Sequence, residues 1–429
     1  MGDLAVGGER LGRSILHVDI NNFYASVEIR DDPSLAPFPV AVCGDAEARH
    51  GIILAKNYKA KAFGVKTAEA IWQAKQKCPN LVLVPCHFEK YEKVTGESRR
   101  LLLTYSDRVE PFGMDEAWLD ISPYAPTAEA AEEIADEIRE KYKKQLGLTA
   151  SVGVSFNKTF AKLGSDMKKP DATTVITPGN FKNKVWKLPV EDLLFVGRMT
   201  QEKLNLRGIR TIGDLAHVNE SLVRAWLGKW GTALRLTANG VDPGPVVPMG
   251  SEAAVKSIGN SFTSPCDLYN EKEALALLTA LSESVAARLR ASGLMATVVV
   301  LGVRDSVLFS FERQMKLPRP SAIALELRNA AHRLLAENYN FLRPIRSLGV
   351  RATSLVPENA PQQLDFFTDH EAREKRLAAE RAIDDIREKY GKKSLLAGRV
   401  FAQKAAADAL SFEDAPKNFK GMQAGRSAP

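Results

Sequence analysis

Cysteine is scarce in this chain and is not arranged for metal binding or redox chemistry. Only four of the 429 residues are cysteines, and none pair as C-x-x-C: Cys43, Cys78, Cys86 and Cys266. This spacing argues against a zinc knuckle and against a redox dithiol. No apolar run approaches the roughly 18–20 residues of a membrane span, and residues 1–14 lack the apolar core of a secretory signal. We therefore expect a reduced, cytoplasmic protein with no membrane partner.

The common glycine-rich phosphate loops are also missing. No two glycines are separated by a single residue, so there is no G-x-G dinucleotide fingerprint. No glycine is followed five residues later by Gly-Lys, so there is no Walker A loop, and the six histidines form no H-E-x-x-H motif. Any phosphate chemistry then has to rest on metal ions bound by carboxylates.

The composition is that of a globular protein, but the charge is unevenly distributed. Apolar residues make up 45% and charged residues 26%, and the length suggests about two to four compact units. Residues 1–177 carry a net charge of −2, residues 178–356 one of +8 and the remaining tail one of +1. This asymmetry suggests that the second part holds a polyanion on which the first part acts. A solvated basic surface would give the same counts.

Short apolar runs alternate with amphipathic segments over residues 14–177, which is typical of strands interleaved with helices. We expect strands at 14–20, 38–43, 51–55, 81–84, 118–121 and 148–154, and helices at 67–78, 88–105 and 130–142. This order predicts an α+β domain with a ferredoxin-like centre. Residues 181–239 are predicted to be helical, and the segment 241–247, rich in Pro and Gly, to be a linker.

A second sheet domain is predicted after the linker. Its strands are expected at 257–263, 297–303, 307–311 and 345–355, and its helices around 277–289 and 327–334. The order βαββαβ describes a small separate domain. In the last strand Leu348, Val350 and Ala352 share one face, and Arg351 and Thr353 share the other. Such a sheet can pack on helices with one face and lie against phosphates with the other.

Three carboxylates concentrate the candidate chemistry. Asp19 ends the first strand, and Asp115 and Glu116 precede the strand at 118–121. If these two strands are neighbours, the carboxylates converge at one edge of the sheet, where a divalent cation such as Mg²⁺ would neutralise them. Two such ions can activate an attacking oxygen and stabilise a leaving oxygen in phosphoryl transfer. Taken alone, the Asp-Glu pair is more typical of a surface turn than of a metal site, and Asp120 is expected to be a surface or capping residue.

Three ordered motifs make the chain recognisable. They are H-V-D-I-N-N-F-Y-A-S-V-E (17–28), P-F-G-M-D-E-A-W-L-D (111–120) and G-V-S-F-N-K-T-F-A-K-L-G-S-D-M-K-K-P (153–170). Over about residues 14–367 the chain closely resembles the Y-family translesion DNA polymerases, most of all the DNA polymerase IV branch.

The resemblance implies a right-hand polymerase architecture of class α+β. It predicts a ferredoxin-like palm, small fingers, a helical thumb and a separate βαββαβ little finger. The implied bounds are palm 14–30 and 88–177, fingers 31–87, thumb 178–240, linker 241–255, little finger 256–357 and tail 358–429.

The resemblance also implies roles for single residues in the palm. Asp19 and Asp115 match the aspartates that bridge two Mg²⁺ ions, and Glu116 matches the acidic residue beside the primer 3′-hydroxyl. Tyr24 matches the aromatic steric gate, whose flat ring leaves no room for a ribose 2′-hydroxyl. Without the motif, Tyr24 would be interpreted as a core aromatic residue.

Three further residues match contacts to the triphosphate of the incoming nucleotide. Tyr58 and Lys61 lie in N-Y-K-A-K (57–61), which resembles the segment of the fingers that grips the β- and γ-phosphates. Lys169, just before Pro170, matches a third contact that comes from the palm. Considered singly, each lysine is more typical of a solvated surface charge.

Four departures from the family pattern stand out. Asn21 replaces a frequent second Asp, Gly113 replaces the usual Ser before the Asp-Glu pair, and Lys61 replaces the usual Arg, which grips phosphate more directionally. The segment F-V-G-R-M-T (195–200) has lost one glycine of the helix–hairpin–helix turn of the thumb, whose backbone amides would approach a DNA phosphate. All three carboxylates are retained.

The tail carries one further motif. Residues 363–367 have the Q-L-x-F-F form of peptides that bind the sliding clamp, which would use Gln363, Leu364, Phe366 and Phe367. The polar stretch around them and the two adjacent aromatic residues favour a docking function. A helix is expected at 371–390, marked by Ala379, Ile383, Ile386 and Tyr390, and disorder over most of 392–429.

The sequence thus predicts a monomeric, template-directed DNA polymerase of the translesion type. It would add deoxynucleotides to a primer–template by a two-metal mechanism, with low fidelity and without proofreading, and it would associate with the nucleoid. An inactive, DNA-binding or clamp-binding relative would be expected to have lost the carboxylates. Another palm enzyme, such as a nucleotide cyclase, would lack a steric gate and a clamp peptide.

Overall fold

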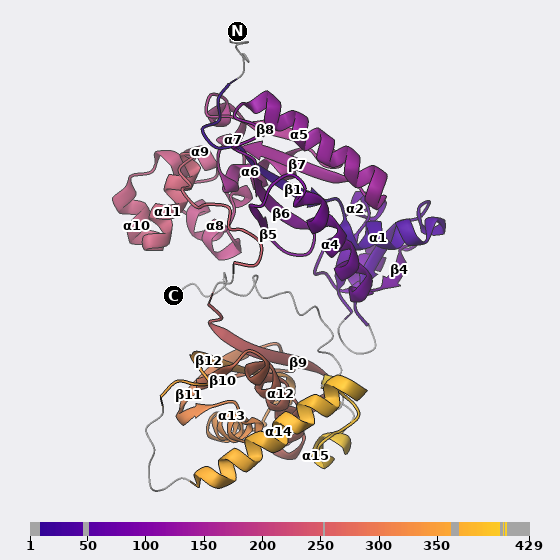
Figure 1. The fold of residues 1–429 in the computed structure, drawn as a ribbon, viewed down its shortest axis with the longest axis vertical. Coiled ribbons are helices and arrows are strands. Elements are labelled where there is room, and N and C mark those ends of the chain that lie inside the picture. Colours follow the sequence, from indigo (N-terminus) through magenta and orange to yellow (C-terminus); the bar gives the residue numbers. More distant parts are fainter. Residues whose placement is uncertain are drawn as a thin grey trace. The chain divides into compact units, whose positions relative to one another are not determined.

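The computed structural model describes residues 9–45, 51–251, 254–361 and 369–403, together with residues 406, 408 and 409. The chain divides into two compact units, residues 1–43 with 53–252 and residues 44–52 with 253–429 (Figure 1). Within the described part of the chain, no helix is both long and apolar enough to cross a bilayer.

A five-stranded mixed sheet forms the centre of the first unit. Its strands, in spatial order, are β5 (Val109–Pro111), β6 (Glu116–Asp120), β1 (Ile15–Ile20), β7 (Ala150–Ser155) and β8 (Thr173–Ile176). Strand β1 pairs antiparallel with both β6 and β7, and β7 pairs parallel with β8. All six residues of β1 are buried, as its continuous apolar run predicts. The strands predicted at 14–20 and 118–121 are thus neighbours, which is the condition for their carboxylates to converge.

Helices cover both faces of this sheet. They are α1 (Phe23–Asp31), α4 (Phe88–Leu102), α5 (Ala128–Lys141) and α6 (Lys158–Met167). Leu16 and Val18 share a core with buried residues of α4 and α5. The alternate residues of β1 face α6, where His17 contacts Ser165. The side chain of Asp19 therefore belongs to the α6 face of the sheet.

A smaller sheet follows β1 and α1 along the chain. It comprises β3 (Ile53–Lys56), β2 (Val40–Cys43) and β4 (Val82–Pro85), with α2 (Tyr58–Ala62) and α3 (Ile71–Lys77) beside it. The helix expected at 67–78 begins only at Ile71. Residues before it form a turn in which Ala68 has a φ of 67° and the Glu69 carboxylate accepts the Lys66 N–H, and both features interrupt helical geometry.

The segment 181–239 is helical, as expected. It contains α7 (Phe181–Val185), α8 (Arg198–Asn205), α9 (Ile212–His217), α10 (Glu220–Leu227) and α11 (Lys229–Ala238). The segment expected to be a linker has no regular structure, yet its first part is fixed to this unit. The Asp242 carboxylate accepts hydrogen bonds from the backbone and hydroxyl of Thr159, and Val246 is buried.

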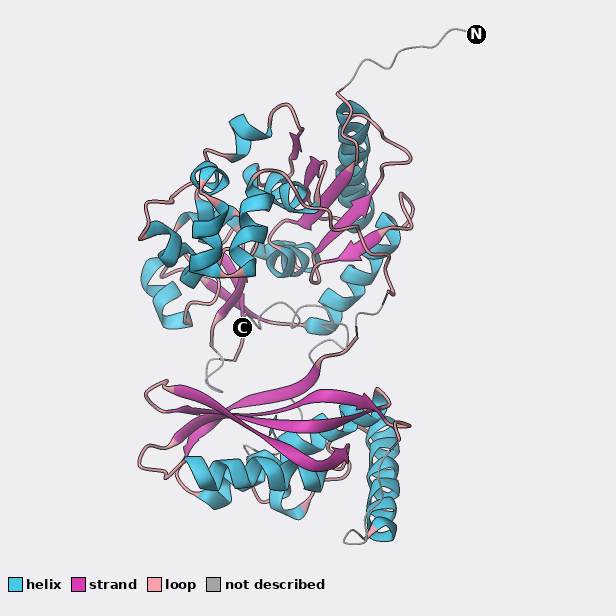
Figure 2. Cartoon of the chain, turned by 90° about the vertical axis from the view of Figure 1, so that its left-hand side faces the viewer, coloured by secondary structure: helices cyan, strands magenta, loops and turns pink. Residues whose placement is uncertain are grey.

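The second unit has the predicted βαββαβ order. Its elements are β9 (Ser257–Leu268), α12 (Glu271–Ala291), β10 (Leu294–Asp305), β11 (Ser310–Ser321), α13 (Ala324–Asn338) and β12 (Ile345–Pro357). The spatial order of the strands is β11-β10-β12-β9, with α12 and α13 on one face (Figure 2). As predicted, Leu348, Val350 and Ala352 are buried, while Arg351 lies on the other face and pairs with Glu312.

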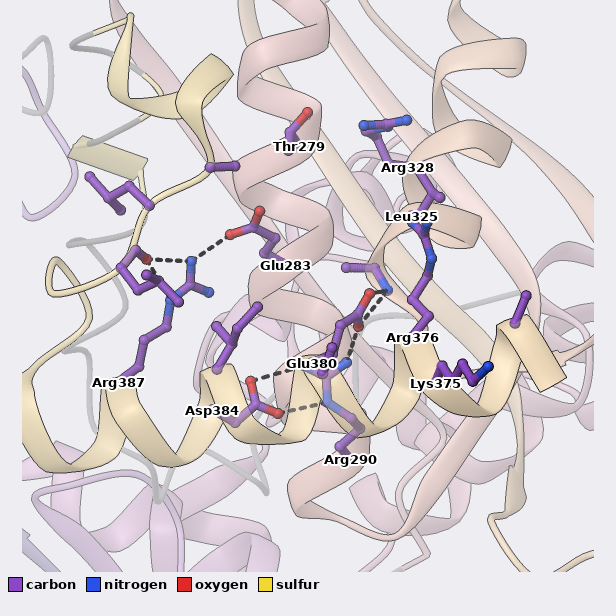
Figure 3. Close-up of a pocket in the computed structure, with 17 residues that line it drawn as sticks. Thr279, Glu283, Arg290, Leu325, Arg328, Lys375, Arg376, Glu380, Asp384 and Arg387 are labelled. Carbon is purple, nitrogen blue, oxygen red and sulfur yellow. Dashed lines mark hydrogen bonds and ion pairs between the residues drawn. The ribbon is translucent and has the colours of Figure 1, made fainter.

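The helix expected at 371–390 is present and packs on α12 within the second unit. Helix α14 (His370–Tyr390) begins where the Asp369 side chain accepts the Ala372 N–H. It contacts α12 largely through ion pairs beside a cavity of about 740 Å³ (Figure 3). A short helix, α15 (Gly398–Phe401), lies within the stretch where disorder was expected. The predicted clamp peptide, 363–367, lies outside the described residues.

Candidate active site

The antiparallel register of β1 and β6 brings two of the three predicted carboxylates together. Asp19 lies directly opposite Glu116, so both side chains project from the same face of the sheet. Asp115 immediately precedes β6, and its carbonyl accepts the N–H of Ile20 at 3.1 Å. The sheet edge thus collects acids from two segments that are almost a hundred residues apart.

The charges of these acids act on one another. Burial, reinforced by the charge of Glu116, raises the pKa of Asp19 to about 7 and that of Asp115 to about 6. Burial also opposes ionisation of Glu116, but contacts with His17 and Lys162 outweigh it and lower the pKa of Glu116 to about 2. A cation is therefore favourable beside Asp19 and Asp115.

Two lysines supply positive charge at this edge. The ammonium of Lys169 lies 2.7 Å from Asp19 Oδ2 and 2.8 Å from Asp166 Oδ1, and Lys162 forms an ion pair with Glu116. Among the described residues, no three acidic, His or Cys side chains already form a ready-made metal-binding group. The donor chemistry nonetheless fits a hard divalent cation, since burial, with the charge of Glu116 as a further cause, raises the pKa of both Asp19 and Asp115.

Tyr24 lies beside the acids in the first turn of α1. Its ring stacks on Tyr91, with centroids 4.3 Å apart and an interplanar angle of 17°, and its hydroxyl donates to the sulfur of Met114 at 3.4 Å. Burial, with a contribution from the charge of Asp115, raises the pKa of Tyr24 to about 12. The ring is thus held by contacts on its face and at its hydroxyl, close to Asp115.

The two candidates from the segment 57–61 also reach this region. Asn57 caps α2 by accepting the N–H of Ala60, which places Tyr58 in the first turn. Burial raises the pKa of Tyr58, and the charges of Lys169 and Asp19 are near enough to act on it. The exposed Lys61 lies 5.7 Å from the centre of the Tyr58 ring. Tyr58 and Lys169 therefore approach the acidic edge from two different segments, and Lys61 lies next to Tyr58.

Two of the departures from the family pattern occupy unusual backbone conformations. Gly113 has a φ of 99°, a region that glycine adopts without strain, and its carbonyl accepts a hydrogen bond from Arg99 at 3.1 Å. Phe195 has a φ of 72°, is 53% exposed, and packs against Trp230 with centroids 5.6 Å apart. The predicted thumb turn, which has lost one glycine, thus contains a non-glycine residue in the left-handed conformation.

Sequence reasoning missed two residues that contact Glu116, and of its two alternatives for Asp120 the structure supports the capping residue. His17 is fully buried, with Nδ1 2.8 Å from Ser165 Oγ and Nε2 3.1 Å from Glu116 Oε2. The period-two alternation of β1 puts His17 on the same face as Asp19 and would have indicated it; no local signal indicates Lys162. Asp120 is buried rather than on the surface, and its carboxylate accepts the N–H of Ser122.

Comparisons with known proteins identify the family of the chain. Residues 18–166 match the impB/mucB/samB family, and residues 255–366 match the C-terminal domain of that family. The chain is 47% identical to DNA polymerase IV of Acetivibrio thermocellus, over 90% of this chain and 97% of the relative. It is 37% identical to DNA polymerase IV 1 of Bacillus subtilis, over 90% and 92% of the two chains.

The fold also has a counterpart among solved structures. A chimeric Y-family DNA polymerase superposes with a TM-score of 0.71 at 23% sequence identity. The match covers 80% of this chain and 99% of the chimera. At that identity the match bears on the fold, which is α+β with a separate C-terminal sheet domain, as predicted.

Proposed function

The chain belongs to the Y family of DNA polymerases, in the DNA polymerase IV branch, and we propose that it performs its chemistry where Asp19, Asp115 and Glu116 meet. It is a DNA-directed DNA polymerase of the translesion type and binds DNA. The observation that carries the proposed site is the register of β1 and β6, which sets Asp19 opposite Glu116.

Y-family polymerases use divalent metal ions, and these three carboxylates would hold them. We assign Asp19 and Asp115 to two Mg²⁺ ions, with Glu116 beside the primer end. Bound there, such ions would lower the pKa of the primer 3′-hydroxyl and stabilise charge on the leaving pyrophosphate. In the chain itself, Lys162 compensates Glu116 and Lys169 compensates Asp19. Both lysines keep positive charge where phosphates would enter.

The remaining site residues would select and hold the nucleotide. Tyr24, fixed against Tyr91, would block a ribose 2′-hydroxyl by its bulk. Tyr58, Lys61 and Lys169 would contact the triphosphate. This proposal is supported by the positions of Tyr58 and Lys169, which are near Asp19, and by the position of Lys61 beside Tyr58.

The parts of the molecule receive their proposed names from this assignment. The palm would comprise 14–30 and 88–177, the fingers 31–87, the thumb 178–240, the linker 241–255 and the little finger 256–357. Small fingers would leave the site open to damaged templates, with low fidelity and no proofreading. We also propose that the protein acts as a monomer in the nucleoid, and that residues 363–367 bind the sliding clamp.

Primer extension tests the site directly. With Mg²⁺, deoxynucleotides and an undamaged primer–template, we expect the wild type to extend the primer and Asp115→Ala to fail while still binding DNA. Glu132→Gln, which removes an exposed acid from α5, is the matched control and should extend normally. Extension by Asp115→Ala at the wild-type rate would refute the assignment, and DNA binding without extension by the wild type would indicate a scaffold protein.

A further inference from the structure

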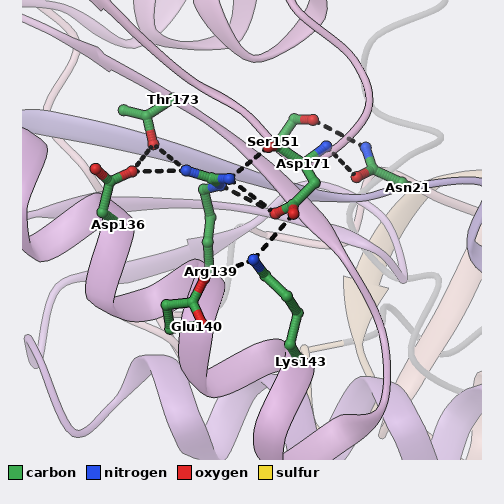
Figure 4. Close-up of polar contacts among 8 residues, drawn as sticks. All are labelled: Asn21, Asp136, Arg139, Glu140, Lys143, Ser151, Asp171 and Thr173. Carbon is green, nitrogen blue, oxygen red and sulfur yellow. Dashed lines mark hydrogen bonds and ion pairs between the residues drawn. The ribbon is translucent and has the colours of Figure 1, made fainter.

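The segment between α6 and β8 carries Lys169 and is held by a polar network on the side of α5 (Figure 4). We propose that Arg139 is a positioning residue for the incoming nucleotide: by fixing Asp171, it sets the place of Lys169. This inference rests on the proposed contact of Lys169 with the triphosphate. The network itself involves none of the residues assigned to metal or nucleotide.

Arg139 grips Asp171 from helix α5. Its Nε and Nη2 lie 3.2 and 2.9 Å from Asp171 Oδ1, and Nη2 also donates to the carbonyl of Asp171. Its Nη1 donates to Asp136 at 2.7 Å, which fixes the plane of the guanidinium. The Arg139 side chain is only 16% exposed, so these charge-assisted bonds are partly protected from water. Lys143 adds an ion pair to the other carboxylate oxygen of Asp171 at 2.9 Å.

The backbone N–H of Asp171 is held from the opposite direction. It donates to Asn21 Oδ1 at 2.9 Å, and Asn21 Nδ2 donates to Ser151 Oγ at 2.9 Å. Asn21 is 1% exposed, so its amide uses both polar atoms within the protein. This arrangement accounts for Asn21, one of the departures from the family pattern, because an amide both accepts from Asp171 and donates to Ser151.

Asp171 is thereby fixed at every polar group. Its N–H, its carbonyl and both carboxylate oxygens have partners. Its φ of 51° is a left-handed conformation that side chains rarely adopt, so the surrounding contacts have to maintain it. Two residues earlier, Lys169 reaches Asp19, which in turn lies two residues before Asn21. Residues 19–21 and 169–171 are thus joined by two contacts, one from Asn21 to Asp171 and one from Asp19 to Lys169. These contacts limit how far the Lys169 backbone can move from the acidic edge, and a contact with phosphate depends on the position of that backbone.

Single-nucleotide incorporation, with KM for the nucleotide separated from kcat, tests this role. Arg139→Gln keeps a polar side chain but loses the guanidinium group that bonds Asp171. We therefore expect the KM for the nucleotide to rise about fivefold or more and kcat to change little. Arg139→Lys can keep one of the bonds and should restore part of the loss. Lys141→Gln is the matched control, since it removes the same charge from the same helix, where Lys141 pairs with Glu137 away from the segment of Lys169. It should leave KM unchanged.

A double-mutant cycle separates positioning from general stabilisation. If Arg139 acts through Lys169, adding Arg139→Gln to Lys169→Ala should raise KM no further. An unchanged KM in Arg139→Gln, or effects that multiply in the double variant, would overturn the inference. Asp171→Asn keeps the backbone contacts and weakens the charged ones, so it should show a smaller effect and serves if Arg139→Gln does not fold.

The same experiment tells this inference apart from the proposed function. An unchanged KM in Lys169→Ala would refute the triphosphate contact itself, and with it the role of Arg139. A raised KM in Lys169→Ala with no effect of Arg139→Gln would refute the positioning role alone.

Discussion

Among single residues, Tyr24 is the proposed barrier to ribonucleotides, and its ring rather than its hydroxyl should provide the selectivity. Tyr24→Ala removes the ring that stacks on Tyr91, so we expect the ratio of ribonucleotide to deoxynucleotide kcat/KM to rise at least about tenfold. Tyr24→Phe loses only the hydrogen bond to Met114 and should retain the discrimination. Incorporation assays with both nucleotide types measure the ratio, and unchanged exclusion in Tyr24→Ala would disprove the gate.

Gly113 allows a second residue-level prediction, because its φ of 99° is costly for any side chain. Gly113→Ser introduces the residue that is usual in the family but should lower the free energy of unfolding by about 1 kcal/mol. Gly96→Ser is the control. Gly96 lies inside α4 with nothing within 4 Å of an added Cβ, so serine should be neutral or slightly stabilising there. Thermal or denaturant unfolding of the two variants gives the comparison; equal stability would contradict the requirement for glycine.

Among the elements, helix α14 depends on ion pairs rather than on a buried apolar face, since none of its residues is buried. Arg290, whose side chain is 7% exposed, binds both Glu380 and Asp384. Arg290→Gln leaves these two acids partly buried without their cation, and should cost about 3 kcal/mol of stability in the second unit. The exposed pair of Arg333 with Glu337 is the control, and Arg333→Gln should cost less than about 0.5 kcal/mol.

Hydrogen exchange measures the docking of α14 directly. We expect the amides of α14 to lose protection in Arg290→Gln and to keep it in Arg333→Gln. Full protection in Arg290→Gln would show that the helix is held mainly by other contacts.

For the whole molecule, the concentration of positive charge in residues 178–356 predicts binding to DNA that depends strongly on salt. That stretch carries a net charge of +8, against −2 in residues 1–177. Because binding releases counterions from phosphates, affinity for a primer–template should fall at least about tenfold between 50 and 200 mM salt. Fluorescence anisotropy at several salt concentrations measures the slope of log affinity against log salt concentration. Arg351→Gln, on the sheet face away from α12 and α13, should make it shallower, whereas a salt-independent affinity would contradict this interpretation.

Much of the architecture could be predicted from local pattern because the relevant signals are short-range. Three such signals depend only on residues that are close together in the sequence. They are the apolar run of β1, the period of the helices at 181–239 and the alternation of Leu348, Val350 and Ala352. Boundaries were less predictable where side chains compete with the backbone. The helix expected from residue 67 begins only at Ile71, after the turn in which the Glu69 carboxylate accepts the Lys66 N–H.

The sequence by itself determined the fold class, the family and the identity of the candidate acids, because ordered motifs specify residue types at fixed spacings. Only the tertiary structure decided which partners those acids have. His17 and Lys162 contact Glu116 from other parts of the chain. In the same way, the hydrogen bonds from Arg139 to Asp171 join two segments that are distant in the chain. Such contacts depend on strand register and on helix packing across the sheet, and no local period encodes them.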